Sequence, residues 1–238
     1  MPSNSKLKQY QQLHSKKFRQ KYGLFVVEGL KSVNEIANSN WQVETILCTK
    51  EFLAKHTEVL HFQYEIIEAP VFYKISTLKT PQEILAIAKI QQPQIVVNDW
   101  SIALDGINDP GNLGTIIRIA DWYGISTIYC SPNSVDVFNP KVIQATMGSF
   151  LRVLVIETDL VEALRNKTVF ATLLNGENIR DVQNPTGGVI LIGNEANGIN
   201  GNLLKQVPHK AITIPRIGNA ESLNAGIATA ICCERLIG

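Results

Sequence analysis

The chain has 238 residues, of which 45% are hydrophobic and 18% charged, and its formal net charge is +1. This composition is that of a folded globular protein, long enough to bury a core without disulfides, and it excludes a disordered chain. No apolar run approaches the roughly 18 residues of a membrane span, and the first residues lack a signal-peptide pattern, so we expect a cytoplasmic protein without a membrane partner.

The chain begins with a basic arm, which is predicted to be helical over residues 5–21. The first 27 residues contain six Lys or Arg and no acidic residue, and residues 1–93 contain 12 basic against 8 acidic residues. Residues 94–238 have the opposite balance, 10 against 13. Such an arm suits a polyanion, although a solvated helix end would have the same composition. We expect deletion of residues 1–21 to weaken the binding of such a polyanion.

Helical and strand patterns alternate after the arm. Strands are predicted over 24–28, 43–48, 62–67 and 84–90, and helices over 29–38, 51–56 and 71–77. Residues 91–94 (Gln-Gln-Pro-Gln) lack apolar periodicity and contain a proline, so they are the best linker candidate. We therefore predict a small α/β domain over residues 1–93.

A second α/β domain is predicted over residues 94–238. Strands are expected near 95–107, 126–131, 152–157, 168–174, 188–193 and 210–215. Helices are expected near 112–123, 139–149, 159–166, 200–206 and 222–236. Several strands are continuously apolar, as in a parallel sheet covered by helices on both faces.

Three polar turns follow strands of the second domain, over residues 109–114, 193–198 and 218–224. In an open parallel sheet, ligands bind beyond the carboxyl ends of the strands, so these turns predict one composite site. None of them has the glycine pattern of a dinucleotide fold or a P-loop.

Each of these turns also has a plain structural interpretation. Asn112 could cap a helix that leaves Arg118 in solvent, and Ser222 could cap the last helix. The core face of that last helix is predicted to consist of four apolar residues: Leu223, Ile227, Ala230 and Ile231.

Taken together, the three turns resemble the motifs of the SpoU-type (TrmH-like) RNA 2′-O-ribose methyltransferases of the SPOUT superfamily. The first reads N-x-G-x-x-x-R from Asn112 to Arg118, the second is Gly-Asn-Glu over 193–195, and the third is I-P-x-x-G-x-x-x-S-L-N over 214–224. Residues 25–31 are similar to the opening of the small substrate-binding domain of this family. The sequence departs from the motifs at Ala196-Asn197 and at Arg216.

The resemblance implies a fold, a cofactor and partners. The C-terminal domain would be a mostly parallel sheet with a deep trefoil knot, which topology rules alone would not predict. The cofactor would be S-adenosylmethionine, the substrate a ribosomal or transfer RNA, and the assembly a homodimer formed through the C-terminal domain. The cysteines and histidines have no disulfide or zinc spacing, so no metal is expected.

The resemblance also implies site residues. The catalytic group would be Arg118, Asn112, Glu195, Ser222 and Asn224. The cofactor would be held by Gly193, Ile192, Asn194, Ile214, Gly218, Leu223 and Asn224. The RNA would be held by Lys6, Lys8, Lys16, Lys17, Arg19 and Lys31.

The role of Arg118 follows from elementary chemistry. Lowering a guanidinium from a pKa above 12 to near 7 would cost roughly 7–8 kcal/mol, so a role as general base is demanding. We expect Arg118 to clamp a phosphate beside the target ribose while water or a phosphate oxygen takes the proton. An RNA-binding protein of the same fold without catalysis is the main alternative, and a nicotinamide-dependent oxidoreductase is a third.

Overall fold

The computed structural model describes residues 2–56, 62–96, 98–183 and 185–238, which form two compact units. The small unit comprises residues 1–93 and 136–151, and the large unit comprises residues 94–135 and 152–238. The break after Pro93 lies in the predicted linker. The second domain is not one continuous body, however, because the segment 136–151, which we call the insert, belongs to the small unit.

The small unit is built on a four-stranded sheet of order β1-β4-β2-β3. β4 is antiparallel to β1 and β2, and β3 is parallel to β2. The strands are β1 (Leu24–Glu28), β2 (Val43–Cys48), β3 (Glu65–Ile66) and β4 (Ile84–Lys89). The helices are α1 (Asn4–Gln11), η1 (Gln12–His14), α2 (Lys16–Tyr22), α3 (Leu30–Ala37), α4 (Lys50–Lys55) and α5 (Ala69–Ile75).

The basic arm is interrupted rather than one helix. Ser15 is extended (φ −95°, ψ 133°) between η1 and α2, and Gly23 ends α2 in the left-handed conformation (φ 64°), which glycine adopts without strain. Leu7, Tyr10 and Leu13 on the arm are buried in the small unit's core. The arm is therefore an integral part of the fold.

The insert contains α7 (Pro140–Thr146) and η2 (Ser149–Leu151) and completes an aromatic cluster of the small unit. The rings of Phe138 and Phe150 lie 4.8 Å and 5.8 Å from that of Phe25 in β1. Ile143 and Leu151 join the same core. Burying these side chains is what holds the insert on the small unit.

The large unit contains a six-stranded sheet in which every pair of neighbours is parallel, in the order β10-β8-β9-β5-β6-β7. The strands are β5 (Trp100–Asp105), β6 (Thr127–Cys130), β7 (Leu154–Glu157), β8 (Val169–Asn178), β9 (Gly188–Gly193) and β10 (Lys210–Thr213). Residue 97, within the strand expected over 95–107, lies outside the described residues. The predicted α/β class with a parallel sheet is confirmed.

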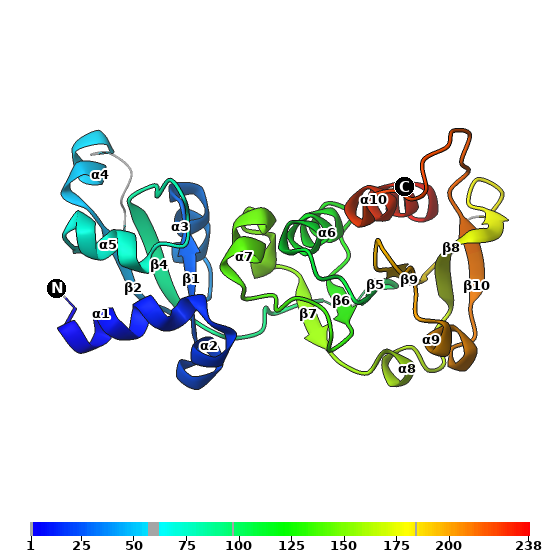
Figure 1. Cartoon of the computed structure of the whole chain (residues 1–238), viewed down its shortest axis with the longest axis horizontal. Helices are drawn as coiled ribbons and strands as arrows, with labels where there is room; N and C mark the ends of the chain where they lie inside the picture. The colour runs from blue at the N-terminus through cyan, green and yellow to red at the C-terminus, as the bar shows by residue number, and fades with distance from the viewer. Residues whose placement is uncertain (1, 57–61, 97, 184) are drawn as a thin grey trace. The chain divides into compact units, whose positions relative to one another are not determined.

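Helices cover both faces of this sheet, which explains its continuously apolar strands. α6 (Pro110–Trp122) and α10 (Ala225–Leu236) lie on one face, and α8 (Leu160–Ala163) and α9 (Gly201–Gln206) lie on the other (Figure 1). α6 and α10 pack closely, because a Cβ at Gly226 would lie only 3.0 Å from Thr115 Cγ2.

The predicted core face of the last helix is wrong. α10 begins at Ala225, three residues later than predicted, and Leu223 and Ile227 are 46% and 54% exposed. Apart from Leu236 at its end, its buried side consists of small residues: Ala225, Gly226, Thr229, Cys232 and Cys233. Close packing against α6 selects small residues there, a requirement that periodicity does not reveal. The knot remains a prediction.

Candidate functional site

The candidate site lies at the carboxyl ends of the parallel strands. β5 ends at Asp105, β9 at Gly193 and β10 at Thr213, and the three predicted turns follow these ends. β5 and β9 are direct neighbours, and β8 separates β9 from β10. Parallel strands place such ends at one edge of the sheet, so the turns gather there.

One chain of hydrogen bonds joins the three turns. The Asn224 amide donates to Asn112 Oδ1 at 2.7 Å, and the Asn112 amide donates to a carboxylate oxygen of Glu195. Asn224 Oδ1 accepts in turn from the backbone N–H groups of Gly226 and Ile227. Three side chains from separate motifs thus form one polar cluster, which we call the Asn-Asn-Glu cluster.

Helix capping explains why these amides are available. The N-cap of α6 is Asp109, whose side chain accepts from the N–H of Asn112, so the side chain of Asn112 is left for the cluster. The N-cap of α10 is Asn224 rather than Ser222. Asn224 caps a helix with its oxygen and reaches Asn112 with its nitrogen, so one residue serves both the fold and the site.

The second turn is held by Asn194. Its amide nitrogen donates to the Gly106 carbonyl at 2.7 Å, and its oxygen accepts from the N–H of Ala196 at 2.8 Å. A Cβ at Gly193 would lie 2.3 Å from the carbonyl carbon of Gly198, so only glycine fits where the turn closes. The departure from the motif at Ala196-Asn197 is therefore accommodated in a closed turn.

Arg118 and Ser222 are not joined to the cluster. Both side chains are exposed, and within the described part of the chain neither has a hydrogen bond to Asn112, Glu195 or Asn224. Arg118 lies on the outer face of α6, one turn before Trp122, which is 84% exposed.

The residues predicted to hold a cofactor differ in what they can offer. Ile192 is buried in the sheet, so only its backbone can face a ligand, and the Asn194 side chain is used within its own turn. Gly218 is exposed in the loop after β10, and Ile214 before it is half-buried. Leu223 is exposed, as are Leu174 after the buried part of β8 (74%) and Ile217 (97%).

These residues fit an adenosine-type cofactor. Large apolar side chains are exposed in the outer half of β8 and in the loop after β10, as expected where a ligand with one apolar and one charged end is bound. Arg216, the other departure from the motif, donates to the Ala220 carbonyl at 3.2 Å and so braces this loop.

Sequence reasoning missed Asp105 and Gly106. Asp105 is 9% exposed, and its Oδ2 accepts from the N–H of Asn200, which fixes the end of the second turn to β5. Gly106 donates its N–H to Ser131 Oγ at 2.8 Å and accepts from Asn194. An acidic residue at the end of a buried strand was the available signal.

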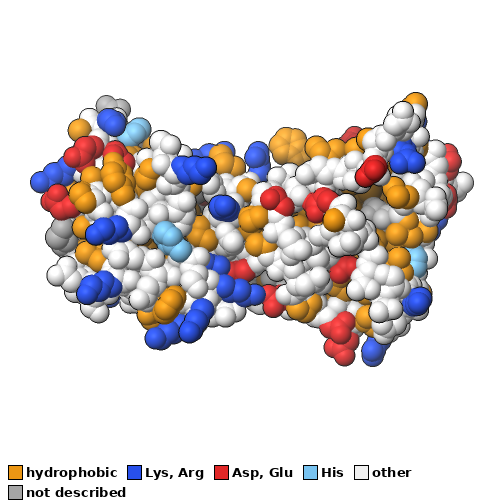
Figure 2. Space-filling view, in the orientation of Figure 1, with side chains coloured by type: hydrophobic (Ala, Val, Ile, Leu, Met, Phe, Trp, Pro, Cys, Tyr) orange, Lys and Arg blue, Asp and Glu red, His pale blue; other side chains and the backbone are white. Residues whose placement is uncertain are grey.

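The predicted RNA-binding residues lie on the small unit, and one assignment among them is wrong. Lys8, Lys17 and Lys31 are exposed, as is Lys16. Arg19 is only 2% exposed and its guanidinium is bonded inside the unit, so it is not available to RNA. On the face shown in Figure 2, Lys and Arg side chains are spread over the small unit rather than gathered in one patch.

Lys6 is exposed but engaged. Its Nζ donates to Glu44 Oε1 at 2.8 Å, and the Tyr10 hydroxyl donates to the same oxygen at 2.7 Å. Burial would raise the pKa of Glu44, but the hydrogen bonds from Lys6 and Tyr10 outweigh it and hold that pKa below its ordinary value. Lys6 is therefore a weaker candidate for RNA phosphates than Lys8 or Lys17.

Two further observations concern the described residues only. No group of three or more His, Cys, Asp or Glu side chains among them is placed to hold a metal ion. No helix within the same ranges is both long and apolar enough to cross a membrane.

The sequence matches two family models. Residues 99–234 match the SpoU rRNA Methylase family, and residues 4–86 match the MRM3-like substrate binding domain. The chain is 30% identical to the 23S rRNA (guanosine(2553)-2′-O)-methyltransferase RlmP of Bacillus subtilis, over 99% of this chain and 97% of that protein.

Solved structures of similar proteins agree with this match. A TrmH-family protein from Porphyromonas gingivalis is 33% identical, with a TM-score of 0.83 over 99% of this chain and 98% of that chain. An AdoMet-bound rRNA methyltransferase from Sinorhizobium meliloti is 30% identical, with a TM-score of 0.82 over 98% and 94% of the two chains. Both likenesses span the small and the large unit.

Proposed function

The chain belongs to the SpoU rRNA methylase family, and on that premise we propose that it transfers a methyl group from S-adenosylmethionine to a ribose 2′-hydroxyl of RNA. The observation that carries this proposal is the Asn-Asn-Glu cluster, which joins one residue from each of the three family motifs. RNA rather than DNA follows from the chemistry, because DNA has no 2′-hydroxyl.

The cofactor would be held by the loops after β9 and β10. The backbone around Gly193 and Ile214 offers hydrogen-bonding groups, and Leu223 offers an apolar surface. S-adenosylmethionine supplies a methyl group that is already activated, so the protein has mainly to position the hydroxyl and accommodate its proton.

The cluster would orient the target nucleotide. The carboxylate of Glu195 is held by Asn112, and Asn112 is held by Asn224, so the remaining acceptor positions of the carboxylate point in a set direction. A carboxylate held in this way can accept from a ribose hydroxyl or from a guanidinium. Preorganised groups of this kind need no rearrangement when the reaction occurs.

Arg118 would clamp the phosphate beside the target ribose and stabilise charge that develops on the attacking oxygen. Its planar fork suits a phosphate, and its exposure on α6 leaves it able to reach a bound RNA. The hydroxyl proton would pass to water or to a phosphate oxygen. Ser222, exposed in the loop before α10, would contact the substrate side of the same site.

The active assembly would be a homodimer formed through α6 and α10. Trp122 at the end of α6 is 84% exposed and Ile227 on α10 is 54% exposed, although the two helices pack together. Exposed large apolar residues on neighbouring helices are typical of a protein–protein interface. Because Arg118 lies one turn from Trp122, dimerisation would bring it to the partner's site.

Ribosomal RNA is the substrate that we propose. The relative from Bacillus subtilis that matches over 97% of its length modifies 23S rRNA, and the small unit matches a substrate-binding domain. Its exposed lysines would hold RNA phosphates with a salt-dependent affinity. A cytoplasmic location remains a prediction.

Calorimetry with S-adenosylmethionine and methyl-transfer assays test this proposal. The protein is expected to bind the cofactor and to methylate an unmodified 23S rRNA transcript at a ribose, which alkaline hydrolysis reveals as an uncleaved position. Methylation of a tRNA transcript alone would change the substrate class. If the protein bound RNA but neither bound the cofactor nor transferred a methyl group, the non-catalytic RNA-binding alternative would be favoured.

A further inference from the structure

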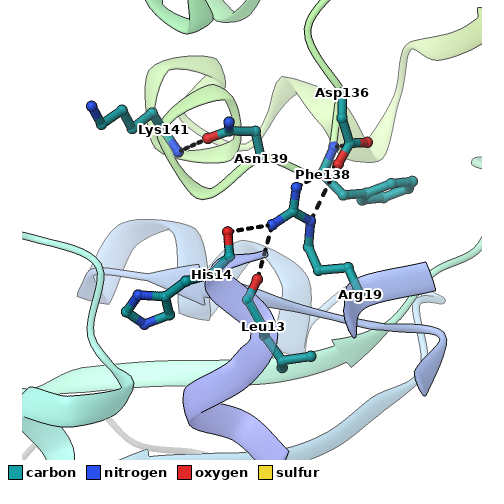
Figure 3. Close-up of polar contacts among 7 residues, drawn as sticks. All are labelled: Leu13, His14, Arg19, Asp136, Phe138, Asn139 and Lys141. Carbon is teal, nitrogen blue, oxygen red and sulfur yellow. Dashed lines mark hydrogen bonds and ion pairs between the residues drawn. The ribbon is translucent and has the colours of Figure 1, made fainter. Parts of the chain in front are cut away.

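Arg19 is a buried cation that the reaction as proposed does not use. Its Nη1 donates to the carbonyl oxygens of Leu13 and His14, both at 2.9 Å, and these carbonyls lie at the end of η1. Its Nη2 and Nε donate to Asp136 Oδ2 at 2.6 Å and 3.2 Å (Figure 3). The guanidinium thus joins the basic arm to the first residue of the insert.

Asp136 organises the start of the insert with its other atoms. Its Oδ1 accepts from the N–H of Phe138 at 3.1 Å, and its carbonyl accepts from the N–H of Asn139 at 3.0 Å. Asn139 caps α7, and Phe138 places its ring against Phe25. The ion pair therefore fixes the point at which the insert enters the small unit.

The residue before Asp136 is bound to the segment that follows β5 in the large unit. The N–H of Val135 donates to the Ile107 carbonyl at 2.8 Å. Gly106, next to Ile107, is held by Ser131 through its N–H and by Asn194 through its carbonyl. A single peptide bond thus separates the Arg19–Asp136 pair from a segment that supports the turn carrying Glu195.

We propose that Arg19 is a positioning residue for methyl transfer: its ion pair with Asp136 fixes the chain next to Val135, whose hydrogen bond to Ile107 supports the segment that holds the Glu195 turn. This inference rests on the proposed function. When the pair is intact, the chain that follows Val135 is held in one geometry. When the pair is broken, that geometry is lost and the Glu195 turn is supported less firmly, while the groups proposed to bind RNA and cofactor are unchanged.

The chemistry of the pair supports a positioning role rather than simple stabilisation. The side chains of Arg19 and Asp136 are 3% and 16% exposed, and a pair removed from water adds little net stability compared with an apolar pair. Its directional hydrogen bonds do specify one geometry of the chain at Asp136. The same α2 carries Lys17, so the buried Arg19 anchors the helix whose exposed side is proposed to contact RNA.

Separate measurements of binding and turnover test the inference. The 238-residue chain would be assayed with S-adenosylmethionine and an unmodified 23S rRNA transcript. Arg19→Met and Asp136→Asn are each expected to lower kcat by about tenfold or more while the Kd values for RNA and cofactor change less than twofold. The double variant leaves no uncompensated buried charge but still lacks the directional pair, so its kcat is expected to stay as low as in the single variants, and recovery to the wild-type kcat would overturn the inference.

Gln20→Ala is the matched control, because Gln20 is the exposed neighbour of Arg19 on α2. It is expected to leave kcat and both Kd values unchanged. Circular dichroism identifies variants that do not fold. If Arg19→Met does not fold, the kinetics of Asp136→Asn and Arg19→Lys test the inference in its place. Wild-type kcat in folded single variants, or an RNA affinity that falls in proportion to kcat, would overturn the inference. Absence of turnover in the wild-type protein would count against the proposed function instead.

Discussion

The Asn224 amide donates to Asn112 Oδ1 at 2.7 Å, across 112 positions of sequence. This bond joins the first turns of α6 and α10, which pack through Thr115 and Gly226. Because Asn224 also caps α10, the geometry of the site is tied to the start of a helix. Substitutions at Asn224 can therefore separate stability from activity.

Asn224→Asp is expected to keep the fold and lose turnover. An aspartate caps a helix as well as asparagine does, but a carboxylate cannot donate to Asn112. This bond is not buried, so losing it costs about 0.5–1.5 kcal/mol, which corresponds to roughly a 2- to 13-fold loss of kcat if the bond persists in the transition state. Thermal unfolding and methyl-transfer kinetics measure the two effects. Asn224→Ala is the comparison, expected to lose both, and wild-type kcat in Asn224→Asp would contradict the role of the cluster.

Mixing inactive subunits tests whether Arg118 acts at the partner's site. Arg118→Ala and Glu195→Ala proteins should each be inactive alone. Random mixing would give heterodimers with one intact site and restore roughly a quarter of wild-type activity if Arg118 acts across the interface. The measurement is methyl incorporation after subunit exchange. Continued inactivity of the mixture would place Arg118 in the site of its own subunit.

Trp122→Glu is expected to produce monomers with little loss of fold. Trp122 is 84% exposed, so its replacement removes no core packing, whereas a charge in an apolar interface is strongly unfavourable. Sedimentation velocity at several protein concentrations gives the oligomeric state. Leu174→Glu, at another exposed apolar side chain, is the control and should leave the assembly unchanged. A dimer that survives Trp122→Glu would exclude this face.

The exposed lysines of the small unit are expected to determine the salt dependence of RNA binding. Lys8→Gln and Lys17→Gln should each reduce the slope of log K against log salt by about 0.7–0.9, without changing cofactor affinity. Lys6→Gln should reduce it less, because Lys6 is paired with Glu44. Filter binding at several salt concentrations measures these slopes. If all three variants had the same slope as the wild-type protein, the arm would not be part of the RNA interface.

Deleting residues 1–21, the experiment that the sequence suggests, is not a clean test. Leu7, Tyr10 and Leu13 are core residues, and the deletion would also remove Arg19. Such a truncation would damage the small unit in addition to removing positive charge. Point substitutions of exposed lysines avoid this ambiguity.

Acid is expected to weaken the contact of the arm at Glu44. The pKa of this carboxyl is lower in the folded protein, so its contribution is present above the unfolded pKa and is lost as pH falls through the folded value. Urea unfolding should therefore show wild type and Glu44→Gln converging in stability between about pH 5 and pH 3. A difference that persists unchanged at pH 3 would contradict this assignment.

Sequence patterns located most elements because burial on both faces leaves a strong apolar signal. β1, β2 and β9 coincide with their predicted ranges. The patterns failed where distant packing decides. Arg19 resembles the lysines around it in sequence, and its burial depends on Asp136, 117 residues away. The insert lies between two strands of the large unit in sequence, yet its aromatic residues are buried against β1.

From the sequence alone one learns the α/β class, the break after Pro93 and the three motifs of the SpoU family, since local composition and spacing encode them. Tertiary structure alone shows that Asn112, Glu195 and Asn224 are bonded to one another and that Arg118 is not bonded to them. It also shows which basic residues of the arm are exposed and which one is buried. The reason is physical: hydrogen bonds between distant residues depend on how helices and strands pack, and that packing leaves no local pattern.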